Sequence, residues 1–123
     1  MSFSLSPVVS DVGTLYAIQT AASATVDTLD PTAGVLYKVE IDNTAGTSAV
    51  FVKGYDVAGA GSVNVGVTDP QWIFKCPAGT KRSYASGAGS AYANGFKVAC
   101  TTTKGTAGNT SPTWAVSYGI LLG

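Results

Sequence analysis

Histidine is absent from this 123-residue sequence, and charged residues are scarce. The seven basic and seven acidic residues leave a formal net charge of zero. Without histidine, the commonest general base and the commonest metal ligand are both missing, which removes most hydrolase mechanisms. Without an excess of basic residues, the chain lacks the electrostatic signature of binding to nucleic acid or to an anionic membrane. We therefore expect neither of these partners and no enzyme activity.

Long apolar segments are missing as well. No run approaches the ~20 residues of a transmembrane helix, and residues 1–13 contain no Lys or Arg ahead of an apolar core, as a signal peptide requires. The sequence therefore predicts a protein made in the cytoplasm. Its two cysteines are Cys76 and Cys100. Because disulfides are uncommon in a reducing compartment, we interpret both as small buried core residues, and their pairing stays open.

The most regular pattern lies between residues 34 and 56. Apolar residues alternate with charged ones, as in a strand with one buried face: Val35, Tyr37, Val39 and Ile41 against Lys38, Glu40 and Asp42. Turn-forming residues follow at 43–47, and a second run rich in β-branched and aromatic residues covers 48–56. This arrangement predicts a β-hairpin with a five-residue loop. A second layer is expected to cover its apolar face, since a lone hairpin is marginal in water.

Shorter runs of the same character fill the rest of the chain. They predict one or two strands within residues 14–27, a strand over 71–76 with Trp72, Phe74 and Cys76 inward, a half-buried strand over 96–101 with Lys97, Ala99 and Thr101 outward, and a last strand from Pro112 to Leu122. The count is about eight strands and no helix. The sequence therefore predicts an all-β antiparallel sandwich or barrel, with residues 14–123 as a single domain.

Residues 1–13 differ from this domain. Phe3, Leu5, Val8 and Val9 are set among serines and a proline without a clear period. The segment is either a frayed terminus or an extended N-terminal arm that lies across a neighbouring subunit or another protein surface, because isolated apolar residues gain little unless something covers them.

Groups able to do chemistry are scattered. Glu40 and Asp42 lie on one side of the same strand, where they would flank a sugar or hold Ca²⁺, but the sequence favours a solvated outer strand face, because no further oxygen-rich loop accompanies them. The tetrapeptide GAGS occurs at Gly59 and at Gly87 without the Lys-Ser/Thr of a phosphate loop, so both are expected to be surface loops. We assign no catalytic, cofactor-binding or metal-binding residue.

Several aromatic residues are candidates for surface contacts. Tyr55, Tyr84 and Tyr92 lie near predicted loops and are expected to be exposed, where they would stack against a glycan or a protein partner. Trp72 and Trp114 are in phase with aliphatic neighbours and are expected to face inward.

Three segments carry a resemblance to a known family: KVEIDNTAGTSAVFVKGYD, FKCPAGTKRSYA and GFKVACTTTKGTAGNTSPTWAVSYGILL. They resemble virion surface proteins of tailed phages, of the capsid cement or head-decoration type, over roughly residues 34–122. The motifs IDNTA, PAGTKRS and the Gly-Thr-rich loop before the last strand contribute most, and all are structural turns. The resemblance implies a β-sandwich of jelly-roll character, a homotrimer, and attachment to the outer face of the major capsid protein lattice.

The sequence and the resemblance together predict a non-enzymatic capsid decoration protein of the virion that stabilises the head. Phe3, Leu5, Val8 and Val9 are then expected to contact the capsid or a neighbouring protomer. Two alternatives remain open at this point. One is a structural component of the tail or fibre, and the other is a carbohydrate-binding β-sandwich module that attaches to the host surface.

Overall fold

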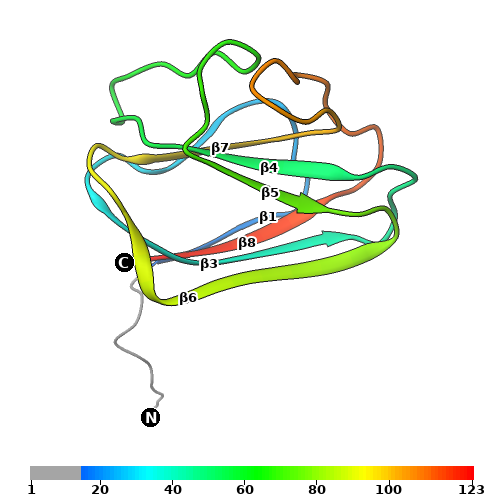
Figure 1. Ribbon diagram of the computed structural model, residues 1–123, viewed down its shortest axis with the longest axis horizontal. Helices are drawn as coiled ribbons and strands as arrows, with labels where there is room; N and C mark the ends of the chain where they lie inside the picture. The colour runs from blue at the N-terminus through cyan, green and yellow to red at the C-terminus, as the bar shows by residue number, and fades with distance from the viewer. Residues whose placement is uncertain (1–14) are drawn as a thin grey trace.

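The computed structural model describes residues 15–123, which form two antiparallel sheets packed face to face (Figure 1). The strands are β1 (Leu15–Gln19), β2 (Asp27–Asp30), β3 (Gly34–Asn43), β4 (Val50–Tyr55), β5 (Trp72–Cys76), β6 (Thr80–Tyr92), β7 (Phe96–Thr101) and β8 (Ser117–Leu122). The predicted all-β sandwich of about eight strands is confirmed. Within the described residues, no helix is long and apolar enough to cross a membrane.

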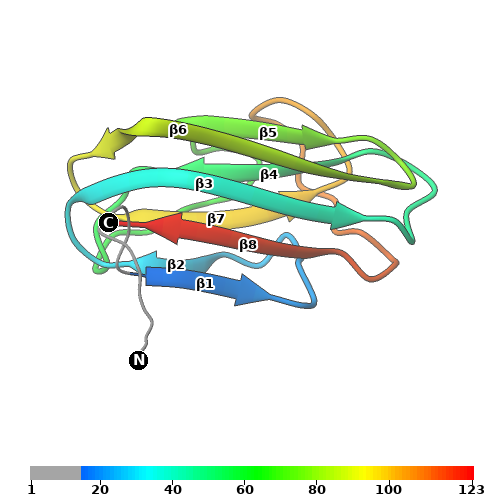
Figure 2. The ribbon, with the colours of Figure 1, turned by 90° about the horizontal axis from the view of Figure 1, so that it is seen from below.

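The order of the strands defines a jelly roll. One sheet has the order β1-β8-β3-β6 and the other β2-β7-β4-β5. The first strand pairs with the last, the second with the seventh, the third with the sixth and the fourth with the fifth, so the chain wraps around the sandwich as one folded-over ribbon. Strands β1 and β2 lie along one open side, and β5 and β6 along the other (Figure 2).

The core fills the space between the sheets. Its fully buried side chains come from both inner faces and include Val39, Ile41, Val52, Phe96 and Ile120. Trp72 and Phe74 pack against this cluster, whereas Ile73 and Lys75, which alternate with them along the strand, are exposed, as the alternation over 71–76 predicts. Trp114 also packs against the core, although the last strand begins at Ser117 and not at Pro112.

The predicted hairpin over residues 34–56 is wrong. Strand β3 pairs with β6 and β8, whereas β4 pairs with β5 and β7, so the connection between them crosses from one sheet to the other. The side chain of Asn43 stabilises the segment that crosses between the sheets. Its buried amide donates to the carbonyl oxygens of Ser48, Cys76 and Pro77 at 2.9–3.3 Å, and its Oδ1 accepts from Trp114 Nε1 at 2.7 Å.

A β-bulge shifts the phase of β3. The pairing with β6 passes from Leu36 opposite Ser90 to Lys38 opposite Ala85, which leaves Tyr37 facing four residues of β6. Leu36 is therefore buried, while Val35 and Tyr37, predicted to share the inner face, are only partly covered. The second GAGS segment belongs to this irregular part of β6 and not to a loop.

The outer face of the second sheet is covered by the chain's own loops, which rise over β4 and β7 (Figure 1). All six residues of β7 are buried, so the half-buried strand expected there is wrong. Lys53 and Lys97 reach outward into these loops. The Lys53 ammonium donates to the carbonyl oxygens of Gly105 and Gly108, both at 2.7 Å, and the Lys97 ammonium donates to those of Gly59 and Gly61 at 3.2 and 2.7 Å.

The two cysteines are free and buried, which confirms their interpretation as core residues. Cys76 lies opposite Val50 and Cys100 opposite Val52, so strand β4 separates them. Two strands that flank a third are roughly 10 Å apart, beyond the Cα separation of about 7 Å that a disulfide tolerates.

We expect both thiols to be unreactive in the native protein. Burial raises the pKa of the Cys100 thiol to about 12, which keeps it in the poorly nucleophilic protonated form. Titration with a chromogenic disulfide reagent should give no rapid reaction in buffer and two thiols per chain in denaturant. Rapid reaction of either thiol in buffer would contradict this packing.

Candidate functional site

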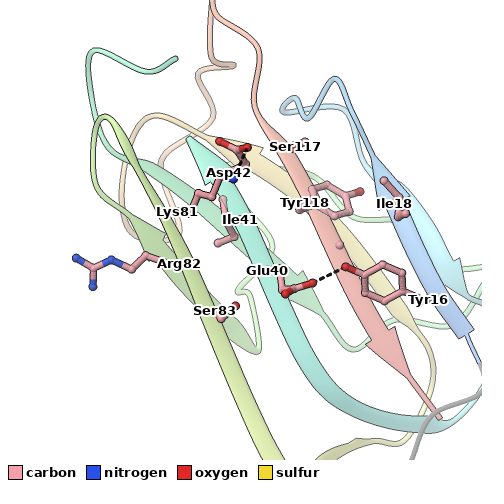
Figure 3. Close-up of a pocket in the computed structure, with 11 residues that line it drawn as sticks. Tyr16, Ile18, Glu40, Ile41, Asp42, Lys81, Arg82, Ser83, Ser117 and Tyr118 are labelled. Atoms are coloured by element: carbon pink, nitrogen blue, oxygen red, sulfur yellow. Dashed lines mark hydrogen bonds and ion pairs between the residues drawn. The ribbon is translucent and has the colours of Figure 1, made fainter. Parts of the chain in front are cut away.

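The outer face of the β1-β8-β3-β6 sheet carries a trough of about 250 Å³ (Figure 3). Its floor is β8, where Ser117 and Gly119 have small or absent side chains. A row of paired residues crosses it from Ile18 on β1, through Gly119, to Glu40 on β3 and Ser83 on β6. The trough exists because small residues on one strand lie between large ones on its two neighbours.

One wall of the trough is acidic. Glu40 accepts a hydrogen bond from the Tyr16 hydroxyl at 2.5 Å and forms an ion pair with Lys38 at 3.1 Å. The Tyr16 hydrogen bond, followed by that of Lys38, lowers the pKa of the Glu40 carboxyl. The alternation of β3 places Asp42 on the same face, as predicted. This wall is therefore ionised at neutral pH.

Asp42 has its own partners. The Thr44 hydroxyl and backbone N–H donate to its carboxylate at 2.7 and 3.0 Å, and these bonds lower the pKa of the Asp42 carboxyl. The Lys81 ammonium lies 3.9 Å away across the strand pair. The side chain of Arg82 is exposed and points away from the trough (Figure 3).

The opposite wall is apolar and lies on the first strand. Tyr16 is 46% exposed and Ile18 68% exposed. The ring of Tyr16 leans over Gly119, where a Cβ atom would lie 2.1 Å from its hydroxyl oxygen, so only glycine lets Tyr16 reach Glu40. The hydrogen bond to Glu40 raises the pKa of the Tyr16 phenol, which therefore stays protonated as the donor.

The two carboxylates of this face are already engaged by neighbouring groups. Both carboxylates are held by donors and by lysine, and within residues 15–123 no group of three or more histidine, cysteine or acidic residues is placed to hold a metal ion. Apolar, acidic and basic side chains alternate over a few strands of one open face. Such a mixed face is typical of a protein–protein contact with a polar rim.

The structure corrects the expectation of three exposed tyrosines. Tyr55 is 1% and Tyr92 2% exposed, whereas Tyr84 is partly buried. Tyr92 donates to Asp30 at 2.7 Å and its ring packs against Trp72 and Phe96. Tyr84 packs on Phe74 and donates to the Lys75 carbonyl. The sequence misled because Tyr55 and Tyr92 end strands β4 and β6, where they close the core, and because Tyr84 lies within β6 against Phe74 instead of in a loop.

The Tyr55 hydroxyl has no hydrogen-bond partner among the described residues, although it is buried. Because a buried hydroxyl without a partner costs free energy, we expect Tyr55→Phe to raise the free energy of unfolding by about 1 kcal/mol. Urea denaturation measures this change. A loss of more than about 1 kcal/mol would show that the hydroxyl has a stabilising partner.

The remaining predicted contact residues are Phe3, Leu5, Val8 and Val9, and they lie outside the described residues. Their role stays a prediction. Sequence reasoning missed Tyr16, Ile18, Lys81 and Ser83 as members of one surface, because their grouping depends on the strand order β1-β8-β3-β6.

Comparison with known proteins supplies no relative. No protein-family model, curated protein sequence or solved structure matches this chain.

Proposed function

We propose that this protein is a non-enzymatic structural protein of a tailed-phage virion that decorates the outside of the capsid. It binds the major capsid protein lattice through the open face of the β1-β8-β3-β6 sheet and stabilises the head. The observation that carries the proposal is the difference between the two outer faces of the sandwich. One is covered by the chain's own loops, whereas no loop within residues 15–123 covers the other, on which Tyr16, Ile18 and Ser83 are exposed.

The composition of the open face supports a protein partner. Ile18 and Tyr16 supply apolar area, while Glu40, Asp42 and Lys81 supply charges of both signs. A face of this kind gains affinity when many copies bind a repeating lattice, because each weak contact is multiplied by the symmetry of the shell. Decoration needs no bound cofactor and no chemical step.

The loop-covered face supports an orientation in which the β1-β8-β3-β6 face meets the capsid and the loops face solvent. Lys53 and Lys97 fix the loops to the sheet through four backbone carbonyl groups. The exposed residues of these loops are mostly glycine, alanine, serine, threonine and asparagine, with Val67 as an exposed hydrophobic residue. A capsid coat needs such a face toward solvent. The N-terminal residues Phe3, Leu5, Val8 and Val9 would add contacts to the capsid or to a neighbouring protomer, and the resemblance implies a homotrimer.

A pair of matched variants tests which face binds. Ser83→Arg places a large cation on β6, where Ser83 lines the trough at one edge of the open face, whereas Ser62→Arg makes the same change on the loop over the other sheet, and both serines are exposed. We expect Ser83→Arg to weaken binding to undecorated heads at least tenfold and Ser62→Arg to leave it unchanged. Co-sedimentation over a range of protein concentrations measures both. Equal binding by the two variants would remove the open face from the mechanism.

The carbohydrate-binding alternative is less well supported. Glycan recognition through stacking requires exposed aromatic rings on one face, and two of the three tyrosines expected to supply them are buried. A tail or fibre component would have the same fold. Reconstruction of the virion distinguishes it, because the protein would then be found on the tail and not on the head.

A further inference from the structure

Strand β1 has an open edge in the part of the chain that the structure describes. It pairs with β8 on one side, and no residue of 15–123 pairs with its other side. Leu15, Tyr16 and Ile18 on this strand are 41%, 46% and 68% exposed, and they are three of the five large exposed hydrophobic residues in the described region. An apolar strand with unpaired backbone groups is a template for pairing with another strand.

The other three edges carry features that oppose pairing. Strand β2 is short, bears Asp27 and Asp30, and has a register shift. Strand β5 bears Lys75, and β6 bears Lys81 and Arg82 together with the irregular segment opposite Tyr37. Charges, bulges and short length are the means by which proteins protect their sheet edges. The sequence of β1, LYAIQ, contains no charged residue, glycine or proline.

We propose that two copies of this chain associate through antiparallel pairing of their β1 strands. With the twofold axis at Ala17, Tyr16 of each copy lies opposite Ile18 of the other on the outer face. An aromatic residue opposite a β-branched one is a favourable cross-strand pair. Pairing through β2 or β6 would instead bring carboxylates or cations of two copies together. The occupant of the β1 edge is therefore a second β1, and the product is a continuous eight-stranded sheet.

The association is weak. Two five-residue strands bury much less than the ~1,200–2,000 Å² of a stable interface, so a dissociation constant of roughly 0.1–1 mM is expected. Neighbouring copies held on any regular surface reach millimolar effective concentrations, at which such a contact forms. The pairing goes beyond the proposed function, since it needs no capsid and can be measured with the purified protein alone.

The first test compares two matched substitutions in the full chain by sedimentation equilibrium from micromolar to millimolar concentration. Ile18→Lys lies on β1, and Val67→Lys replaces a β-branched residue of similar exposure, 71%, in a turn. The wild-type mass should rise with concentration, Ile18→Lys should raise the dissociation constant at least tenfold, and Val67→Lys should not change it. Urea midpoints equal to that of the wild type establish that both variants are folded.

The second test examines the register. In the double variant Tyr16→Glu with Ile18→Lys, the new carboxylate of each copy lies opposite the new ammonium of the other, so association should be restored. The double variant Tyr16→Lys with Ile18→Lys places two cations opposite each other and should not associate. Concentration-independent mass in the wild type, or association that Ile18→Lys leaves intact, overturns the proposal. If the full chain does not associate but the variant lacking residues 1–13 does, the chain's own N-terminal segment occupies the edge, and the proposal is likewise wrong.

Discussion

Lys53→Ala is expected to lower the free energy of unfolding by about 3 kcal/mol. The Lys53 side chain is 0% exposed, and its ammonium donates to two backbone carbonyl groups of the loop that follows β7. Alanine removes both charge-assisted hydrogen bonds, leaves the buried Gly108 carbonyl without its donor, and deletes the packed aliphatic stem. Urea denaturation measures the loss, and hydrogen exchange should show faster opening of residues 102–110.

Two controls separate the causes of this effect. Lys53→Met keeps the stem but removes the donors, so it should lose less stability than Lys53→Ala. Burial lowers the pKa of the Lys53 ammonium, which means that part of its hydrogen-bond energy is offset by desolvation. Lys104→Ala changes an exposed lysine of the same loop and should cost less than about 0.5 kcal/mol. If Lys53→Ala costs no more than Lys104→Ala, the ammonium does not hold the loop.

Asn43→Ala is expected to cost about 3–4 kcal/mol. This side chain joins four segments where the chain crosses between the sheets, through donors to Ser48, Cys76 and Pro77 and an acceptor for Trp114. All of these partners lose a hydrogen bond when the amide is removed. Because the Trp114 indole N–H is among them, its fluorescence spectrum should shift in the folded variant, which reports the local change separately from the loss of stability.

Asn43→Asp tests the donor role directly. A carboxylate has nearly the same shape as the amide but accepts only, so it would face three carbonyl oxygens without a proton to share. At neutral pH this variant should be at least as unstable as Asn43→Ala, and acidification that protonates the new carboxyl should recover part of the loss. Asn64→Ala, at an exposed loop position, should be nearly neutral. Equal stability of Asn43→Asp and the wild type at neutral pH would contradict the assigned hydrogen bonds.

The alternation of apolar residues predicted where most strands lie but not how they are joined. The turn residues after Asn43 suit a hairpin and a crossing between sheets equally well, because both need a reversal of the chain. What selects the crossing is the burial of Asn43 among carbonyl groups that come from residues 48, 76 and 77. Those contacts exist only after the two sheets have packed, so no local pattern in the sequence around Asn43 predicts them.

Lysine was the least predictable residue type in this chain. Lys53 and Lys97 occupy outward positions of their strands, where a charged side chain normally indicates solvent. Both are buried because glycine-rich loops fold back over them and offer backbone carbonyl groups as acceptors. The sequence does place the two lysines in strands that are followed by long loops. However, their hydrogen-bond partners are backbone carbonyl groups, which are the same for every residue type and so cannot be identified from the sequence.

Only part of the candidate site could be predicted from the sequence. The alternation of β3 correctly placed Glu40 and Asp42 on one outward face. Tyr16 and Ser83 join them only because β1 is brought to β8, and β8 and β6 to β3, by the jelly-roll order. Sequence separations of more than twenty residues between neighbouring strands explain why a pass along the chain does not find such a surface.

The most direct test of the proposed function is to mix the purified protein with undecorated heads of its own phage, sediment them, and then heat the heads with and without it. We predict that the protein sediments with the heads at a fixed ratio set by the lattice and raises the temperature at which they rupture. Heads that retain none of the protein, at concentrations well above those in the lysate, would contradict capsid decoration while leaving the jelly-roll fold unaffected.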